Sequence, residues 1–380
     1  MRKTLRVGII GTGYAGWRHA EAFSRLPDVA VTALWNRTYA RAERLTSALS
    51  RPDIKIFSDW RDLVRSGDVD IISITTDPAF RQAPLTEGLA QNLHVLVEKP
   101  LALGLSEAKE MASLAQRART VTAVSFNWRY SPGCQTCWRA IQEGQIGSLT
   151  DIRTVWRMRY SPSFGFARSW SEMSGSLREA GSHEFDRVRF LTGWDFKRVV
   201  CSLRSPQELR AILSDNSTPS DTSALVMSEM SGKSAGVLQL AITSGSPERQ
   251  ITIGGENGTL ALSSEWVTHR LTEESNGWRI LSNEVKVVRQ RADESAPVKL
   301  EIEESDRQPG SVQSGQHTWN RLIADFVSAV RRGDFKHESV PHLPHISDGL
   351  AAQQVISACE QSHAERRWVD LEQDLAAVPG

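Results

Sequence analysis

The chain of 380 residues has little of several features that mark whole classes of protein. Its four cysteines are too few for the disulfide framework of a secreted protein of this length. Its 45 acidic residues balance its 45 basic residues, so no net charge draws it to nucleic acid or to an anionic membrane. No apolar run approaches the roughly 20 residues that span a bilayer. We therefore expect a globular protein of the reducing cytoplasm, with neither nucleic acid nor membrane as partner.

One pair of cysteines has the spacing of a zinc or redox site. Cys134 and Cys137 are separated by two residues, but no second pair accompanies them, and the surrounding pattern is helical. Two buried thiols on one helix are therefore favoured over a metal or redox site. No metal site is predicted.

A glycine-rich turn follows the first apolar strand, Arg6–Ile10. The turn reads Gly-x-Gly-x-x-Gly, and a helical pattern comes directly after it. In this context the first glycine permits the tight turn, the second lets the backbone approach a pyrophosphate, and the third lets the helix pack on the strand. The helix N-terminus supplies free N–H groups to the phosphates. The predicted cofactor-binding residues of this turn are Gly11, Gly13, Tyr14, Ala15 and Gly16.

The end of the second strand, Val29–Trp35, bears on the choice of dinucleotide. An acid at this place would bind the adenosine ribose of NAD, but the sequence has Asn36 and Arg37. Without the carboxylate nothing repels a 2′-phosphate, and Arg37 can pair with it through a charge-assisted hydrogen bond. We therefore expect NADP(H). The alternative is that Arg37 stacks on adenine and the protein uses NAD equally well.

A lysine stands at the carboxyl end of a later buried strand. The apolar run after His94 stops at Glu98-Lys99-Pro100, because proline cannot donate a ladder hydrogen bond. Ligands of open α/β sheets bind outside the carboxyl ends of strands. Lys99 is therefore a candidate for chemistry, and a solvated lysine in a turn is the alternative. Glu98, Lys99 and, from the preceding strand end, Thr75 and Thr76 are expected to contact the cofactor.

The order of patterns along the chain predicts an α/β protein of two domains. Up to residue 126, short apolar strands alternate with helices, as in a Rossmann doubly wound parallel sheet. Ser106 is expected to cap one of these helices. From residue 127, long strands with period-two alternation predict an α+β domain with a large, mainly antiparallel open sheet. We expect a dinucleotide-binding domain at 1–126 and a substrate-binding and oligomerisation domain at 127–380, whose final helices pack back toward the first.

These residues resemble one family, the glucose–fructose oxidoreductase/inositol dehydrogenase (Gfo/Idh/MocA) family. The resemblance runs from about residue 4 to the final helices. Its motifs are the glycine loop Gly11–Gly16 followed by His19, the Glu98-Lys99-Pro100 signature, the segment Asn127-Trp128-Arg129-Tyr130-Ser131-Pro132, and the helix start Gly175–Asp186. Glu179 in this last motif stands where the family usually has aspartate.

Three residues of the last motif have helical spacing. Glu179, His183 and Asp186 lie at i, i+4 and i+7, which would place them on one face of a helix. A carboxylate one turn from a histidine can fix its tautomer and raise its basicity. A structural histidine inside a helix is the alternative reading.

The resemblance implies a dehydrogenase or reductase that moves a hydride between NADP(H), or NAD(H), and a hydroxyl or carbonyl of a sugar, cyclitol or related small molecule. It implies that Lys99 and His183 handle the proton, with Glu179 and Asp186 beside them. Substrate-side residues are expected at Arg129, Arg157, Tyr160 and Trp170, although core packing explains aromatic residues equally well.

Two other functions remain as alternatives. Some relatives bind the dinucleotide without turnover and act as ligand-sensing regulators, but these tend to lose the lysine or the histidine. Others keep NAD(H) bound and cleave glycosides, and the preference for NADP(H) argues against this. The resemblance also implies a homodimer or homotetramer formed through the C-terminal sheet, since an exposed apolar sheet face usually marks an interface.

Overall fold

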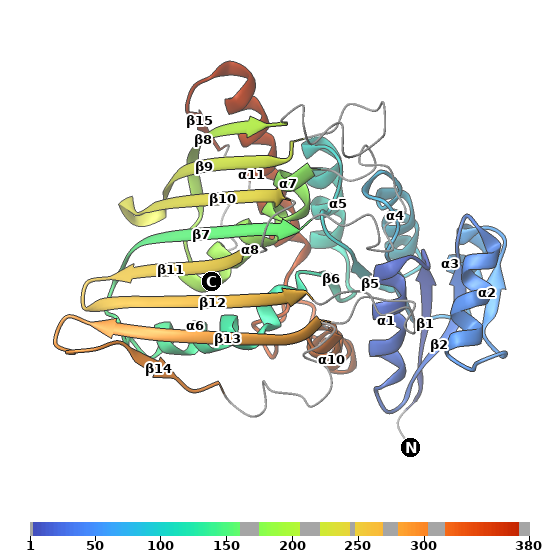
Figure 1. Ribbon diagram of the computed structural model, residues 1–380. Coiled ribbons are helices and arrows are strands. Elements are labelled where there is room, and N and C mark those ends of the chain that lie inside the picture. Colours follow the sequence, from blue (N-terminus) through green and yellow to red (C-terminus); the bar gives the residue numbers. More distant parts are fainter. Residues whose placement is uncertain are drawn as a thin grey trace. The chain divides into compact units, whose positions relative to one another are not determined.

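The computed structural model describes residues 3–159, 175–205, 221–243, 248–268, 280–302 and 316–371. Contacts within the chain divide it into two compact units (Figure 1). Unit 1 comprises residues 1–131 and 310–353, and unit 2 comprises residues 132–309 and 354–380. Each unit is thus built from two stretches of chain, and the stretches of the two units alternate along the sequence. The sequence-based domain boundary between residues 126 and 127 stays a prediction.

Unit 1 contains a six-stranded parallel sheet in the order β3-β2-β1-β4-β5-β6. Its strands are β1 (Leu5–Ile10), β2 (Val29–Trp35), β3 (Lys55–Phe57), β4 (Ile71–Ile74), β5 (His94–Val97) and β6 (Thr122–Val124). They are short and apolar, as expected of strands that are covered on both faces. The chain order reverses between β1 and β4, which is the point where such sheets bind ligands. The predicted doubly wound parallel sheet is confirmed.

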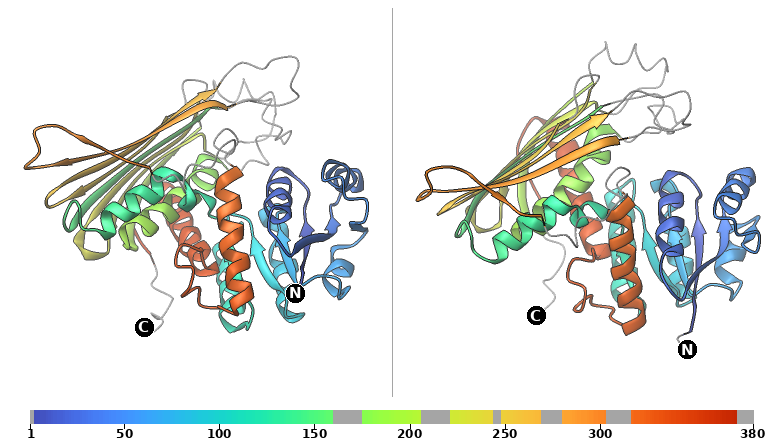
Figure 2. Two further views of the ribbon diagram at one scale, coloured as in Figure 1. Left: turned by 90° about the horizontal axis from the view of Figure 1, so that it is seen from below. Right: turned by 60° about the horizontal axis from the view of Figure 1, so that its bottom comes forward.

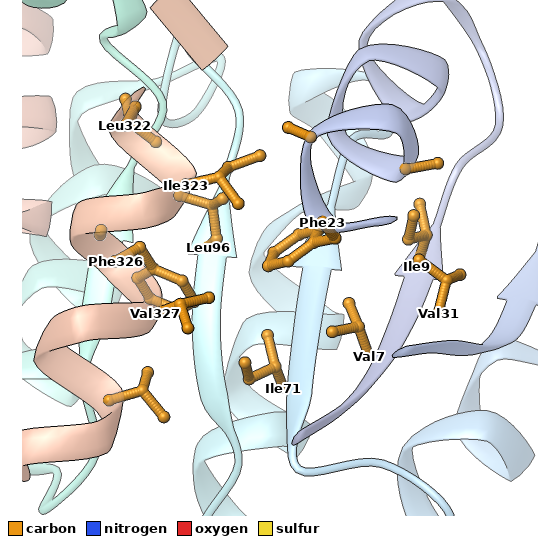
Figure 3. Close-up of a cluster of buried hydrophobic side chains, with 14 of the residues drawn as sticks. Val7, Ile9, Phe23, Val31, Ile71, Leu96, Leu322, Ile323, Phe326 and Val327 are labelled. Carbon is orange, nitrogen blue, oxygen red and sulfur yellow. The ribbon is translucent and has the colours of Figure 1, made fainter. Parts of the chain in front are cut away.

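Helices cover both faces of this sheet. They are α1 (Tyr14–Ser24), α2 (Tyr39–Ala48), α3 (Trp60–Arg65), α4 (Gln82–Ala90), α5 (Leu105–Arg117) and α10 (Gln316–Arg332), with the short turns η1 (Pro78–Phe80) and η2 (Asn127–Tyr130). On one face Phe23 of α1 and Phe326 of α10 share a core with Leu96 of β5 (Figure 3). On the other, Leu63 of α3 and Gly88 of α4 pack closely against the strands.

Unit 2 contains a nine-stranded sheet in the order β14-β13-β12-β11-β7-β10-β9-β8-β15. Its strands are β7 (Leu149–Arg159), β8 (Phe196–Arg204), β9 (Ser223–Met230), β10 (Ala235–Thr243), β11 (Glu248–Gly255), β12 (Gly258–Thr268), β13 (Ile280–Arg291), β14 (Val298–Leu300) and β15 (Val369–Asp370). Among the described strands only β7 and β10 pair in parallel, and the other neighbours are antiparallel. The predicted, mainly antiparallel open sheet is confirmed.

The helices of unit 2 that the structure describes lie on one face of its sheet (Figure 2). They are α6 (Pro132–Gln142), α7 (Gly175–Glu179) and α8 (Gly181–Thr192), and the turn η3 (Ser231–Lys233) joins β9 to β10. The last helix, α11 (Ile346–Glu365), begins in unit 1 and ends in unit 2. Within the described ranges no helix covers the other face, where Leu225 and Met227 of β9 and Val237 of β10 are exposed.

Three sequence-based expectations about helices can be compared with these elements. Cys134 and Cys137 are buried free thiols on one helix, α6, as favoured above. Ser106 does not cap α5, because Gly104 turns the chain and the helix already begins at Leu105. No helix in the described ranges has the length and apolar character needed to cross a membrane.

The expectation that Glu179, His183 and Asp186 share one helix is wrong. The short helix α7 ends at Glu179, and α8 begins at Gly181. Ala180 between them keeps a helical backbone (φ −87°, ψ −43°), so the break is local. His183 and Asp186 are buried on α8, whereas Glu179 is half-buried at the end of the preceding helix.

Candidate active site

The turn between β1 and α1 has the geometry that its three glycines predict. Gly11 has φ +103°, and a Cβ there would lie 2.9 Å from the backbone carbon of Thr75. A Cβ at Gly16 would collide with the carbonyl oxygen of Gly11. At Gly13 the backbone is extended, and a Cβ would meet no atom within 4 Å. The second glycine therefore borders open space, as expected where a phosphate approaches the backbone.

The polar groups around this space fit a dinucleotide. Helix α1 begins at Tyr14, and no side chain caps its first N–H groups. Those groups and the positive end of the helix dipole attract an anion. The hydroxyl oxygens of Thr12 and Thr76 are buried and have no hydrogen-bond partner in the described part of the chain. The Thr75 hydroxyl instead donates to the Gly11 carbonyl oxygen at 2.5 Å and holds the turn closed.

The end of β2 presents a cation beside an aromatic ring. Asn36 accepts a hydrogen bond from the backbone N–H of Thr38 at 2.9 Å, which fixes the local turn. Arg37 is exposed, and its guanidinium carbon lies 5.8 Å from the ring centre of Phe80 in η1. Phe80 is itself 54% exposed. A base that stacks on this ring would have a guanidinium beside it for further stacking or for a phosphate.

Lys99 follows β5 at the same edge of the sheet, and a buried carboxylate lies directly before it. One oxygen of Glu98 accepts the backbone N–H of Lys99 at 3.0 Å. The other lies 3.0 Å from Nε2 of His19, a fully buried residue of α1. Burial alone raises the pKa of Glu98. The hydrogen bond with His19 and the positive charge of Lys99 outweigh burial and lower that pKa to about 2.

A buried arginine ties the ends of β4 and β5 together. The Arg81 guanidinium donates to the carbonyl oxygen of Thr76 at 2.8 and 2.9 Å and to that of Glu98 at 2.7 Å. It also donates to the carbonyl oxygen of Pro100. These backbone contacts fix the strand ends that carry the predicted cofactor residues.

The second predicted catalytic residue lies in unit 2, on α8. The ring centre of His183 is 5.9 Å from that of Trp156 on β7, and both side chains are buried. The guanidinium carbon of Arg249, from β11, lies 4.0 Å above the same indole ring. His183 is thus held in an aromatic and cationic surrounding on the helix-covered face of the sheet.

Beside His183 lies a buried ionic cluster. Glu184 of α8 accepts hydrogen bonds from Arg187 at 2.8 Å and from Arg249 at 3.2 Å. Burial raises the pKa of Glu184, while Arg187 acts in the opposite direction. Two guanidinium groups that share one carboxylate in a buried place fix the orientation of α8 on the sheet.

The predicted substrate residues that the structure describes, Arg129 in unit 1 and Arg157 in unit 2, each have a local ionic partner. Arg129 is buried in η2 and forms an ion pair with Asp348 at 3.0 Å. Arg157 forms an ion pair with Glu248 at 3.6 Å. Because side chains alternate along a strand, Arg157 of β7 points to the face opposite Trp156 and therefore away from His183. Tyr160 and Trp170 lie outside the described residues.

Sequence reasoning gave no role to three residues of this edge: His19, Arg81 and Phe80. His19 carried a signal, because it follows the glycine loop in the motif that suggested the family. Arg81 and Phe80 carried none, since an arginine and a phenylalanine after a strand have no pattern that separates them from surface residues.

Models of known families match most of the chain. Residues 5–126 match the model described as an oxidoreductase family with an NAD-binding Rossmann fold. Residues 139–371 match the model of the C-terminal alpha/beta domain of the same oxidoreductase family.

Individual relatives are distant but extend over the whole chain. An uncharacterized oxidoreductase of Synechocystis is 23% identical, with 98% of each chain covered. The inositol 2-dehydrogenase of Rhizobium meliloti is also 23% identical, with 97% of this chain and 99% of the relative covered.

Two solved structures share the fold. An oxidoreductase domain protein of Kribbella flavida superposes with a TM-score of 0.79 at 22% identity, covering 98% of this chain and 100% of that one. A levoglucosan dehydrogenase in complex with NADH and levoglucosan gives a TM-score of 0.78 at 19% identity, covering 97% and 99%. With both halves matched by its models, the chain belongs to the Gfo/Idh/MocA oxidoreductase family, whose N-terminal domain is an NAD-binding Rossmann fold.

Proposed function

We propose that the protein is an NADP(H)-dependent dehydrogenase or reductase that acts on a hydroxyl or carbonyl group of a sugar, cyclitol or related small molecule. The observation that carries this proposal is the open space at Gly13, bordered by uncapped helix N–H groups and unpaired threonine hydroxyls, at the same sheet edge as Lys99. The names of two relatives, an inositol 2-dehydrogenase and a levoglucosan dehydrogenase, support the substrate class.

The preference for NADP(H) over NAD(H) rests on the end of β2. Asn36 brings no negative charge there, and its side chain is engaged in the local turn. Arg37 is exposed, so it can move to a 2′-phosphate without breaking a buried contact. NAD(H) is the alternative, in which Arg37 and Phe80 serve only the adenine.

The proton chemistry is assigned to two side chains. When bound, the nicotinamide supplies or accepts the hydride. In oxidation, His183 takes the hydroxyl proton as general base, and Lys99 donates a hydrogen bond to the same oxygen and stabilises its developing charge. In reduction the two roles reverse. Glu179 holds either a neighbouring hydroxyl of the substrate or Lys99, and Asp186 orients His183.

The first experiment titrates the protein with NADPH, NADP⁺, NADH and NAD⁺ by tryptophan fluorescence, for the wild type and for Arg37→Ala. We expect tight binding of NADP(H), weakened selectively by the substitution. Equal or better binding of NAD(H) refutes the phosphate assignment, and the absence of binding by any dinucleotide refutes the proposed function. A panel of inositols and aldoses with the preferred cofactor then tests turnover. Binding without turnover would favour a ligand-sensing regulator.

Substitution of the two proton-handling residues tests their roles. Lys99→Met and His183→Asn are each expected to lower kcat by about 10²–10⁴-fold. Dinucleotide affinity should stay within twofold in His183→Asn, whereas Lys99→Met should also weaken it, because Lys99 is expected to contact the cofactor as well. Lys233→Met, at an exposed lysine of the hairpin between β9 and β10, is the matched control and should leave kcat unchanged. Unchanged turnover in either active-site variant would remove that residue from the mechanism.

The remaining proposals concern assembly and location. We propose a homodimer or homotetramer formed through the open face of the nine-stranded sheet. This proposal is supported by exposed apolar side chains on two adjacent strands of that face, Leu225, Met227 and Val237.

A cytoplasmic location stays a prediction, supported by the absence of disulfide bonds among the four cysteines, all of which lie in the described residues.

A further inference from the structure

The buried histidine of the glycine-loop helix has contacts on both ring nitrogens. Nε2 of His19 lies 3.0 Å from the Glu98 carboxylate and 3.3 Å from the Ser125 hydroxyl. Nδ1 lies 2.8 Å from the hydroxyl of Ser73. The imidazole is fully buried, and its partners come from the ends of β4, β5 and β6. One ring therefore joins helix α1 to three strands of the sheet.

The hydrogen of Nε2 has a defined place. Both oxygens of the Glu98 carboxylate accept hydrogen bonds from N–H groups, one from the Trp319 indole and the other from the Lys99 backbone. Nε2 of His19 must then carry the hydrogen and donate it. The Ser73 hydroxyl, 2.8 Å from Nδ1, can rotate to donate to that nitrogen or to accept from it.

The carboxylate connects this histidine to Lys99. Its first oxygen also accepts the indole N–H of Trp319 at 3.4 Å, and its second accepts the backbone N–H of Lys99 at 3.0 Å. If the contact with His19 were lost, the Glu98 side chain could rotate away from the Trp319 indole and from the Lys99 backbone N–H. A buried charged hydrogen bond often adds little net stability, and orienting the groups that share it is one use of such a contact.

We propose that His19 is a positioning residue for Lys99. It holds the Glu98 carboxylate in the place where that carboxylate accepts the backbone N–H of Lys99. It also joins the end of β5 to α1, the helix proposed to receive the phosphates. The proposal rests on the proposed function for the role of Lys99. It concerns no contact between His19 and substrate.

Two amide substitutions separate positioning from packing. In His19→Gln the side-chain amide reaches the place of Nε2 and can still donate to Glu98. In His19→Asn the shorter amide reaches only the place of Nδ1, which faces Ser73, and the contact with Glu98 is lost. Both variants remove the ring and leave a similar polar group, so a packing role would make them equally harmful.

The first measurement does not depend on turnover. Hydrogen–deuterium exchange of the peptide that spans the end of β5 reports whether the Lys99 backbone N–H remains bonded. We expect exchange to be about tenfold faster in His19→Asn, the factor that corresponds to one charge-assisted hydrogen bond, and within twofold of wild type in His19→Gln. Equal exchange in the two variants would overturn the proposal.

Kinetics give the second readout. In His19→Asn we expect kcat to fall about tenfold while KM for the dinucleotide and its Kd by fluorescence stay within twofold, because α1 still presents its N–H groups. His19→Gln should restore most of the loss. If the wild type shows no turnover, the proposed function fails, and the exchange experiment still decides whether His19 positions Lys99.

If the His19 variants do not fold, a less disruptive variant, Ser73→Ala, can be measured instead. Ser73→Ala removes only the hydroxyl at Nδ1 and leaves the ring in place. It should change exchange at the Lys99 backbone in the same direction by about twofold to fivefold. No change in exchange in Ser73→Ala, together with equal behaviour of any His19 variants that fold, would refute the proposal.

Discussion

The glycines of the loop are required for different steric reasons. Adding a methyl group at Gly13 or at Gly16 should therefore affect stability and dinucleotide binding differently. In Gly13→Ala the backbone is extended (φ −77°, ψ −163°), which alanine adopts freely, and its Cβ meets no protein atom within 4 Å. Alanine also restricts the unfolded chain more than glycine does. We therefore expect the free energy of unfolding to stay within about 1 kcal/mol of wild type, or to rise slightly.

Dinucleotide binding should respond in the opposite way. The space beside Gly13 is the place proposed for a phosphate, and overpacking by one methyl group costs about 1–3 kcal/mol, which corresponds to a Kd weaker by roughly 5–150-fold. In Gly16→Ala the methyl group collides with the carbonyl oxygen of Gly11, so this variant should lose about 1–3 kcal/mol of stability even without ligand.

Urea unfolding and fluorescence titration of the two variants test both expectations. A Gly13→Ala protein that binds NADPH as tightly as wild type would show that no phosphate lies against that backbone. A Gly16→Ala protein as stable as wild type would show that the turn can relax, and that close packing is not the reason for its third glycine.

Three further outcomes are expected. Burial and the nearby His345 lower the pKa of His337 to about 4, below its ordinary 6.5, so the unfolded chain binds more protons than the folded chain between these pH values. The free energy of unfolding should therefore fall by about 1–2 kcal/mol from pH 6.5 to pH 5. A urea profile that does not change with pH, or one unchanged in His337→Gln, would contradict this. Glu184→Leu leaves two buried guanidinium groups without their shared carboxylate and should cost about 3–5 kcal/mol in the same assay, whereas a loss below 1 kcal/mol would show that the cluster is solvated. Met227→Lys places a charge among the exposed apolar side chains of the open sheet face, beside Leu225 and Val237. It should reduce the molar mass measured by light scattering to that of a monomer, and an unchanged mass would show that the interface lies elsewhere.

The parts of the fold that follow from local pattern were predictable from the sequence. β2 was expected at its observed bounds, because its apolar run has clear limits on both sides. The glycine loop was predicted with its turn, its open space and its helix, since each glycine has its own steric reason. The long strand β13 was missed, because its run contains polar residues at many positions and alternates poorly.

A site residue could be predicted only where the sequence immediately around it marks its position. Lys99 stood out because a strand and a proline frame it. The contacts that hold Glu98 come from residues far apart in sequence, such as Ser73, Ser125 and Trp319, and no spacing rule links them. Arg157 was assigned to the substrate from its charge, but strand alternation directs it to the face opposite His183.

The placement of α10 has a consequence for synthesis. Ile323, Phe326 and Val327 complete the core of unit 1, yet the ribosome makes them after almost all of unit 2 (Figure 3). When the first 131 residues leave the exit tunnel, the sheet face around Leu96 still lacks its covering helix. A nascent chain with such an apolar face is prone to aggregate until the missing element arrives. We therefore expect that residues 1–131 alone would need a chaperone to stay in solution, and that a separate peptide of residues 316–332 would bind to them.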